Sequence, residues 1–197
     1  MHYKVFFVDF GGVLVLNRVK EIGAYFDRTY GLTKDDSTNT FRFLHSGEKS
    51  DAEVDRYLEE HHIKKDVWQK YKAELFNSET RNEDLINILE DAKKSGIKII
   101  YTTNNSADFI KIMQKYGLTE LPHIIVNSSL LGVTKPDLPF WEASMIEAEK
   151  LCPGIRKDEI LLIDDSDVNT ESAISFGLGA VLYNGKDADE IIKLAII

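Results

Sequence analysis

Five short runs of mostly apolar residues occur along the chain, at residues 4–8, 97–102, 123–126, 160–163 and 180–183. They lack the regular alternation of polar and apolar positions that marks a strand exposed on one face. Continuous apolar runs of this length are typical of strands buried on both faces of a parallel sheet. The pattern therefore predicts a strand at each of the five places.

Between the later runs, apolar residues recur at the three- and four-residue spacing of a helix. Ser106 is a predicted helix cap. The predicted helices are two that end at Gly96 and Gly117, one over about 139–151, one that reaches Phe176, and a closing helix from about Asp187. Strands that alternate with helices predict an α/β fold: a Rossmann-like parallel sheet with helices on both faces.

Residues 17–81 have a different pattern, with helical spacing and little that resembles a strand. Apolar residues over 19–30 form one helical stripe, and Gly31 ends it. Phe41 and Leu44 belong to a second predicted helix. The segment therefore reads as an all-α insert within the sheet domain.

Two further helices are predicted in the insert. The sequence Ser50-Asp51-Ala52-Glu53 is a capping box, so a helix is expected to begin at Ser50. Another helix is expected over about 65–76. The predicted domains are thus a sheet domain of residues 1–16 and 82–197 and a small helical insert of residues 17–81.

Composition excludes several classes of protein. Hydrophobic residues make up 43% and charged residues 29% of the chain, as in globular proteins with a sizeable core. The net charge of −9 argues against the broad basic surface that nucleic acids or anionic membranes require. No apolar run approaches the ~18 residues of a membrane span. Met1 leads directly into a predicted strand, so no signal peptide is expected. With one cysteine, Cys152, we expect a cytoplasmic protein without an intrachain disulfide; the sequence indicates no oligomeric state.

Polar residues follow four of the predicted strands, where each strand ends. Asp9 follows the first strand, and residues 102–105 end the second. Residues 134–136 come after the third, and the pair Asp164-Asp165 ends the fourth. Because the carboxyl ends of parallel strands share one edge of a sheet, these side chains can converge there.

Three carboxylates at one edge would repel one another unless a cation lay among them. Mg²⁺ is the expected cation, because it takes oxygen ligands and commonly a substrate phosphate. Lys135 and a threonine hydroxyl supply donors for that phosphate, so the set predicts phosphoryl transfer to a carboxylate nucleophile. Purely structural alternatives are Asp9 in an Asx-turn, Asp164-Asp165 as a helix cap and Lys135 as a solvated loop residue.

The four polar segments resemble the motifs of the haloacid dehalogenase (HAD) superfamily and occur in that family's order. The resembling segments are residues 5–13, 99–104, 132–137 and 161–169. The likeness covers the whole predicted sheet domain. Residues 17–81 lie where the family inserts a small helical cap that covers the site and selects the leaving group, so the resemblance implies such a cap here.

The resemblance also implies roles for individual residues. It implies that Asp9 attacks phosphorus in line and forms an aspartyl-phosphate. It implies that Mg²⁺ is held by Asp9, the backbone carbonyl of Gly11 and Asp165. Asp164 is then a second acidic contact of the metal.

The phosphate-binding residues implied by the resemblance are Gly12, Thr103, Asn104 and Lys135. The hydroxyl of Thr103 and the backbone amide of Asn104 would bind phosphoryl oxygens. Lys135 would also act in catalysis, by neutralising charge on Asp9 and on the phosphate. The substrate implied is a small phosphorylated metabolite.

One position departs from the family's pattern. Its phosphatases usually carry a second Asp two residues after the nucleophile, where this chain has Gly11. That Asp protonates the leaving group and later activates water, and such help is typically worth about 10²–10⁴-fold. Three interpretations stay open: a phosphatase in which another group or a bound water transfers the proton, a slow enzyme suited to good leaving groups, and a catalytically weak or non-enzymatic protein that binds a phosphorylated ligand.

Two other classes are less compatible with the sequence. The dehalogenase branch of the superfamily also lacks the second Asp but works without a metal, which would leave Asp164-Asp165 beside Asp9 as uncompensated negative charge. Phosphoacceptor signalling domains have their acid pair at the end of the first strand and lack an insert of this size. We therefore expect a Mg²⁺-dependent phosphatase that acts on a small phosphomonoester.

Overall fold

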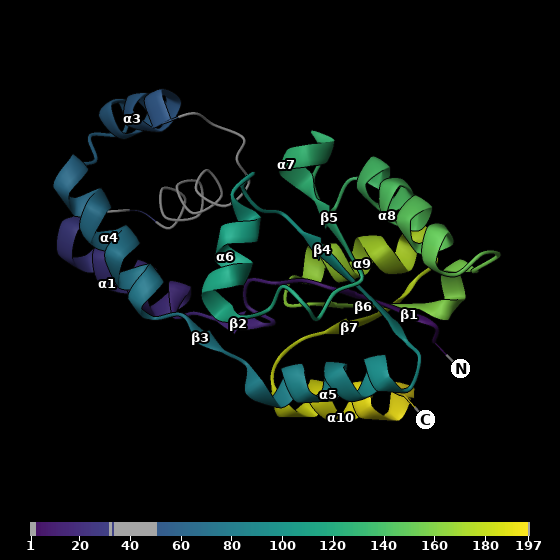
Figure 1. Ribbon diagram of the computed structural model, residues 1–197. Helices are drawn as coiled ribbons and strands as arrows, with labels where there is room; N and C mark the ends of the chain where they lie inside the picture. Colours follow the sequence, from purple (N-terminus) through teal and green to yellow (C-terminus); the bar gives the residue numbers. More distant parts are fainter. Residues whose placement is uncertain (1–2, 32, 34–50, 197) are drawn as a thin grey trace. The chain divides into compact units, whose positions relative to one another are not determined.

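The computed structural model describes residues 3–31, 33 and 51–196. The chain divides into two compact units, one of Met1–Val15 with Arg81–Ile197 and one of Leu16–Thr80 (Figure 1). We call the first the sheet unit and the second the helical unit. In the described part of the chain, no helix combines the length and the apolar character needed to span a bilayer.

The sheet unit is built on one five-stranded sheet with the order β5-β4-β1-β6-β7, in which every neighbouring pair is parallel. Its strands are β1 (Val5–Val8), β4 (Lys98–Thr103), β5 (Ile124–Asn127), β6 (Ile160–Asp164) and β7 (Gly179–Leu182). All four residues of the central strand β1 are fully buried, because helices cover both faces of the sheet. The predicted Rossmann-like parallel sheet is confirmed.

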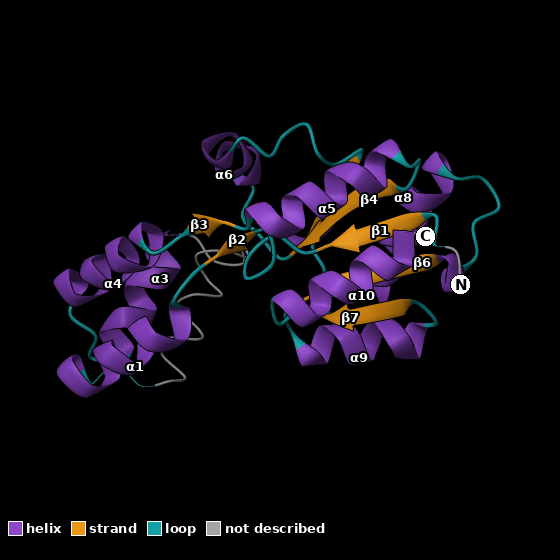
Figure 2. Ribbon diagram, turned by 90° about the horizontal axis from the view of Figure 1, so that it is seen from below, coloured by secondary structure: helices purple, strands orange, loops and turns teal. Residues whose placement is uncertain are grey.

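Helices cover each face of the sheet (Figure 1). Phe6 and Val8 face α5 (Glu83–Lys94), α6 (Phe109–Tyr116) and α10 (Lys186–Ile196), and Val5 and Phe7 face α8 (Leu138–Leu151) and α9 (Asp167–Phe176). Alternate residues of one strand thus belong to two separate hydrophobic cores. The strands lie between the helices in Figure 2 as well.

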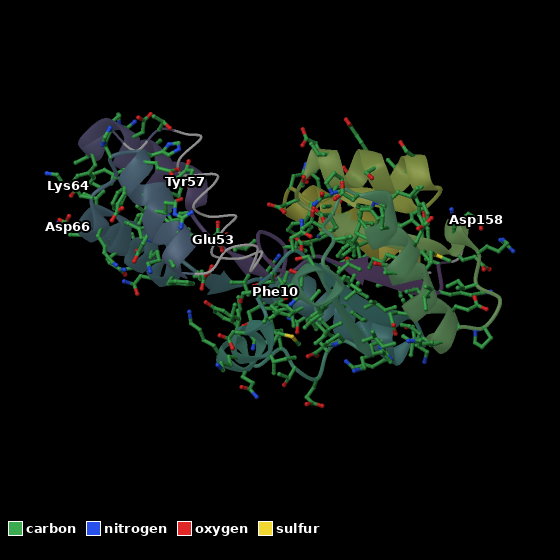
Figure 3. The ribbon with its side chains drawn as sticks, turned by 90° about the horizontal axis from the view of Figure 1, so that it is seen from above. Phe10, Glu53, Tyr57, Lys64, Asp66 and Asp158 are labelled. Carbon is green, nitrogen blue, oxygen red and sulfur yellow. The ribbon has the colours of Figure 1, made fainter. Side chains whose placement is uncertain are left out.

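The helical unit contains α1 (Val19–Tyr30), α3 (Asp51–Glu60) and α4 (Lys65–Asn77). Its buried core consists of Phe26, Val54, Leu58, Val67, Trp68, Tyr71 and Leu75. Figure 3 labels Glu53 and Tyr57 on α3, and the ring of Tyr57 stacks on His61 with centroids 4.0 Å apart. The helix predicted around Phe41 and Leu44, and the predicted cap Ser50, lie outside the described residues.

Three short features differ from the sequence expectation. Strands β2 (Val15–Leu16) and β3 (Thr80–Arg81) pair with each other, although no strand was expected there. Helix α7 (Ser128–Leu131) and the 3₁₀ turn η1 (Lys157–Glu159) were also not predicted. Segments of two to four residues are too short to produce a periodic apolar pattern, so the sequence carries no signal for them.

One predicted helix cap is wrong. Helix α6 begins at Phe109, and its N-cap is Asp108 rather than Ser106. The Ser106 carbonyl accepts a hydrogen bond from the Phe109 N–H at 3.1 Å, so the chain makes one turn before the helix starts. The predicted end of this helix is correct, because Gly117 adopts a left-handed conformation at its C-cap.

Candidate active site

The order of the sheet brings three predicted site segments to one edge. Strand β1 lies between β4 and β6, with Val8 paired to Tyr101 on one side and Ile163 on the other. Asp9 directly follows the last residue of β1, and the polar ends of β4 and β6 lie on either side of it. Central placement of β1 therefore gathers residues that are far apart in the sequence.

Phe10 fixes the chain directly after Asp9. Its side chain is only 2% exposed, and its ring packs edge-on against Tyr101 and Phe109, with centroid distances of 5.9 and 4.8 Å. Figure 3 labels it within the sheet unit. The buried ring holds the start of the loop in place, and the neighbouring Asp9 carboxylate stays at the sheet edge.

Lys135 contributes a buried positive charge to this edge from the segment between α7 and α8. Its Nζ lies 2.9 Å from Asp9 Oδ1 and 2.6 Å from Asp164 Oδ2. The exposed fractions of the three side chains are 1% for Lys135, 13% for Asp9 and 0% for Asp164. A lysine that is 1% exposed and contacts two carboxylates is not solvated, so the reading of Lys135 as a solvated loop residue is wrong.

Burial and the charges of neighbouring groups together shift the pKa values of Lys135 and Asp9. Burial alone would lower the pKa of Lys135, but Asp164 and Asp9 outweigh it and hold that pKa above its ordinary value. Burial raises the pKa of Asp9 from 3.8 to about 7. The charges of Asp164 and Asp165 act in the same direction as burial on Asp9, and Lys135 opposes them. A second cation beside Asp9 would favour its charged form.

Asp164 is held by donors on several sides. Its Oδ1 accepts from the Ser166 N–H at 3.0 Å, and its Oδ2 accepts from Lys135. The Asn169 side chain donates to both oxygens, at 3.0 and 3.2 Å. The carboxylate therefore has a fixed orientation, and it holds Lys135 in place.

Gly12 and Asp165 approach each other closely. A Cβ built on Gly12 would lie 2.6 Å from Asp165 Cγ, and the φ of Gly12 is +78°. Only glycine suits both the conformation and the space at this position. The Gly12 N–H donates to the Val15 carbonyl at 2.8 Å, so the predicted contact of Gly12 with phosphate stays a prediction.

Gly11 differs from its neighbour. A Cβ built on Gly11 would meet no atom within 4 Å, and its φ lies outside the left-handed region. The residue forms a bridge with Val15 and is half-buried. Its predicted contribution of a carbonyl ligand stays a prediction.

The three acidic side chains form a group that suits a hard cation. One carboxylate oxygen each from Asp9, Asp164 and Asp165 lies within 4.8 Å of the others. Mg²⁺ prefers such oxygen donors. Burial is the largest cause of the raised pKa of Asp9, and the charges of Asp164 and Asp165 add to it. The residues therefore fit a divalent cation, as the sequence predicted.

Thr103 and Asn104 end β4 beside this group. Thr103 is the last residue of the strand and is 1% exposed. The Asn104 side chain binds the backbone of Lys135: its Nδ2 donates to the Lys135 carbonyl at 3.0 Å, and its Oδ1 accepts the Lys135 N–H at 2.9 Å. Asn104 thus connects the end of β4 to the segment that carries the lysine.

Three asparagine side chains support the site in ways that the sequence did not predict: no role was expected for Asn82 or Asn169, and for Asn104 only its backbone amide was expected to act, as a phosphate donor. Asn169 orients Asp164, and the side chain of Asn104 orients the backbone of Lys135. Asn82 is buried, and its Nδ2 donates to the carbonyl of Val13 at 2.7 Å, which fixes the loop after β1. Among these, only Asn169 had a local signal, because it lies one turn into the helix that follows Asp164-Asp165.

Comparisons with known proteins agree with this geometry. The model of the haloacid dehalogenase-like hydrolase family matches residues 3–177. A search of curated proteins found no match. A HAD-like family hydrolase of Porphyromonas gingivalis is 17% identical, with a TM-score of 0.73 and coverage of 98% of both chains. A HAD family enzyme of Bacteroides thetaiotaomicron, solved with magnesium and inorganic phosphate, is 19% identical, with a TM-score of 0.67 over 96% of this chain and 98% of the other.

A third similar structure is a HAD phosphatase of Thermococcus onnurineus, 16% identical, with a TM-score of 0.58 over 94% of this chain and 88% of the other. At these identities the solved structures show a common fold. The family model adds agreement in sequence over most of the chain. This protein therefore belongs to the haloacid dehalogenase-like hydrolase family.

Proposed function

We propose that the protein is a Mg²⁺-dependent phosphatase that hydrolyses a small phosphomonoester through an aspartyl-phosphate at Asp9. The observation that carries this proposal is the buried contact of Lys135 Nζ with both Asp9 and Asp164, beside Asp165. A buried cation paired with a strand-end carboxylate is the arrangement that a phosphate-directed nucleophile needs. The phosphatase and the magnesium complex among the similar structures support it.

In this proposal an Asp9 carboxylate oxygen attacks phosphorus and the bond to the leaving oxygen breaks. Lys135 lies against Asp9 and favours its charged form, and it offsets negative charge on the phosphoryl oxygens. The Thr103 hydroxyl and the Asn104 N–H hold those oxygens. Water then attacks phosphorus, which releases phosphate and restores Asp9.

Mg²⁺ would be held by Asp9, Asp165 and the carbonyl of Gly11, with Asp164 as a second acidic contact. It would supply positive charge beside the phosphoryl group, which reduces the repulsion between the carboxylates and the substrate. Asp164 already accepts hydrogen bonds from Lys135, Ser166 and Asn169, so its main role in the proposal is to fix the lysine.

The proposal is tested with p-nitrophenyl phosphate and a panel of metabolite phosphates, with Mg²⁺ and with a chelator. Asp9→Asn is expected to abolish turnover and to prevent a phosphoryl group from appearing on the protein by mass spectrometry. Asp158→Asn is a matched control, because Asp158 lies on η1 before β6, at the opposite end of that strand from Asp164. Turnover in Asp9→Asn equal to wild type would show that Asp9 is not the nucleophile.

A non-enzymatic binding protein would give a different result. It would bind inorganic phosphate in calorimetry, in a manner that depends on Lys135, and would turn over no member of the panel. Lys135→Met separates the two outcomes, because it removes the phosphate-facing charge in both cases but changes a rate only in an enzyme.

A further inference from the structure

We infer that the site acts on phosphates whose leaving group departs as a stable anion, such as acyl, enol or acidic aryl phosphates, in preference to phosphate esters of alkyl alcohols. This inference rests on the proposed function and specifies its substrate class. It is based on the space around Gly11 and on the hydrogen bonds of the neighbouring polar groups.

The first observation is the space beside Gly11. This residue lies two positions after the proposed nucleophile Asp9, on the loop that Phe10 anchors. No atom lies within 4 Å of the position of a Cβ, and the backbone is one that other residues adopt. Nothing in the surroundings of Gly11 therefore requires glycine, and the position carries no proton donor.

The second observation is that the neighbouring polar groups have other partners. Lys135 Nζ contacts two carboxylates, which occupy two of its three N–H donors, and in the proposed function the third faces the phosphoryl oxygens that stay on the transferred group. Asp164 accepts hydrogen bonds on both oxygens. The Tyr183 hydroxyl donates to Asp189 at 3.1 Å. In the described part of the sheet unit the one histidine is His123, which precedes β5 and so lies at the edge opposite the site. These groups do not offer a proton to a leaving oxygen.

The chemical consequence concerns the leaving oxygen. As Asp9 forms its bond to phosphorus, the electrons of the breaking P–O bond stay on that oxygen. An alkoxide requires a proton at this moment, whereas a carboxylate, an enolate or an acidic phenolate departs as the anion and is protonated later by solvent. Water then attacks the aspartyl-phosphate, and its proton goes to solvent or to the released phosphate. No further reactant is required.

The test is a series of aryl phosphates with leaving phenols of decreasing acidity, extended by one alkyl phosphate and by acetyl phosphate. The measured quantity is kcat/KM, because it includes the steps up to phosphoryl transfer and excludes the later hydrolysis. Wild type is expected to show a steep fall of kcat/KM with rising leaving-group pKa. Mass spectrometry is expected to find phosphorylated protein after acetyl phosphate and not after the alkyl phosphate.

Gly11→Asp places a carboxylic acid, which can donate a proton to the leaving oxygen, in the open space beside Gly11. We expect it to raise kcat/KM for the alkyl phosphate by about 10²-fold or more and to flatten the dependence on leaving group. Gly11→Asn has nearly the same size without the acidic proton, so it is expected to keep the steep dependence. Calorimetric titration with Mg²⁺ checks that both variants still bind the metal.

A shallow dependence in the wild-type protein would overturn the inference, because it would show that a proton donor reaches the leaving oxygen from elsewhere. The proposed function would survive that result, since turnover would still depend on Asp9. Failure of every substrate, without phosphorylated protein, would instead overturn the proposed function. The wild-type series decides the matter even if Gly11→Asp does not fold.

Discussion

The carboxamide of Asn104 and the backbone of Lys135 form a closed pair of hydrogen bonds, with Nδ2 donating at 3.0 Å and Oδ1 accepting at 2.9 Å. The two residues lie 31 positions apart in the sequence. These two hydrogen bonds fix the position of the Lys135 backbone relative to the end of β4. Asn104 is therefore a positioning residue for the ion pairs that Lys135 makes with Asp9 and Asp164.

We expect Asn104→Ala to reduce kcat by about 10²-fold, because a displacement of a catalytic group by about 1 Å has an effect of this size. The measurement is steady-state phosphatase kinetics together with Mg²⁺ titration, which should change little. Asn87→Ala, at an exposed position of α5, is the matched control. Unchanged kcat in Asn104→Ala would show that Lys135 keeps its place without this pair.

The neighbouring glycines of the first loop permit a second prediction. Gly12→Ala would force Asp165 to move, because the new Cβ would lie 2.6 Å from its Cγ. We expect the affinity for Mg²⁺ to fall by about 10–100-fold, the usual cost of disturbing the support of a metal ligand. Isothermal titration with Mg²⁺ measures this directly.

Gly11→Ala is the control for that experiment, since its Cβ would meet nothing within 4 Å. It should bind Mg²⁺ as wild type does. Equal affinities in the Gly12→Ala and Gly11→Ala variants would contradict a role for Asp165 in holding the metal.

We expect Asp164 and Asp165 to have different roles, with Asp164 contributing mainly to stability and Asp165 mainly to Mg²⁺ binding. Asp164→Asn leaves the buried Lys135 with one carboxylate partner, and loss of a buried partner is strongly destabilising, so we expect a decrease of about 3 kcal/mol in the free energy of unfolding. Asp165 is exposed, and Asp165→Asn should change this free energy by less than about 1 kcal/mol while weakening Mg²⁺ binding. Urea denaturation without metal compares them; equal effects would contradict the separation.

A buried network of hydrogen bonds around Asn82 also holds the loop after β1 in place. Asn82 donates to Val13 and to the Tyr183 hydroxyl at 2.7 Å each, and that hydroxyl donates to Asp189. Tyr183→Phe leaves Asp189 without this donor, so we expect a loss of about 1–2 kcal/mol in the free energy of unfolding. Tyr25→Phe, on a half-exposed ring of α1, is the control. A loss no larger than that of the control would show that the network contributes little.

Much of the architecture was predictable because the apolar pattern of a parallel sheet is strong. Strands such as β1 and β6 are buried throughout, so their sequences are continuous apolar runs that end in an acidic residue. The convergence of Asp9 and Asp164 followed from topology, because neighbouring parallel strands end at one edge. Lys135 lies beyond β5, between α7 and α8, and was expected at this edge also from the resemblance to the family's motifs.

The supporting residues could not be predicted in the same way. Asn104 and Asn82 act through hydrogen bonds to backbone atoms 31 and 69 residues away, and no local pattern reports such distant partners. The sequence also could not show that a side chain would fit at Gly11 but not at Gly12, because this depends on where Asp165 lies in space. Spacing along the chain identifies the groups that carry charge, but not the groups that hold them.

Glu159 gives a prediction for the pH dependence of stability. A hydrogen bond from Lys4 and one from the Arg156 N–H hold the pKa of Glu159 below its ordinary value of 4.5, and the Lys4 Nζ lies 2.7 Å from its carboxylate. A carboxylate with a lower pKa in the folded state stabilises the fold above its unfolded pKa and loses this contribution as the pH falls through its folded value.

We therefore expect Glu159→Gln to be less stable than wild type at pH 7, with the difference shrinking as the pH falls below about 4.5. Urea denaturation at a series of pH values between 7 and 3 measures this difference, with Glu142→Gln, at an exposed position of α8, as the control. Lys4 directly precedes β1 and Glu159 directly precedes β6. Their ion pair therefore connects the starts of these two strands, at the edge of the sheet opposite Asp9. A difference that stays constant with pH would show that the charge of Glu159 contributes nothing to this connection.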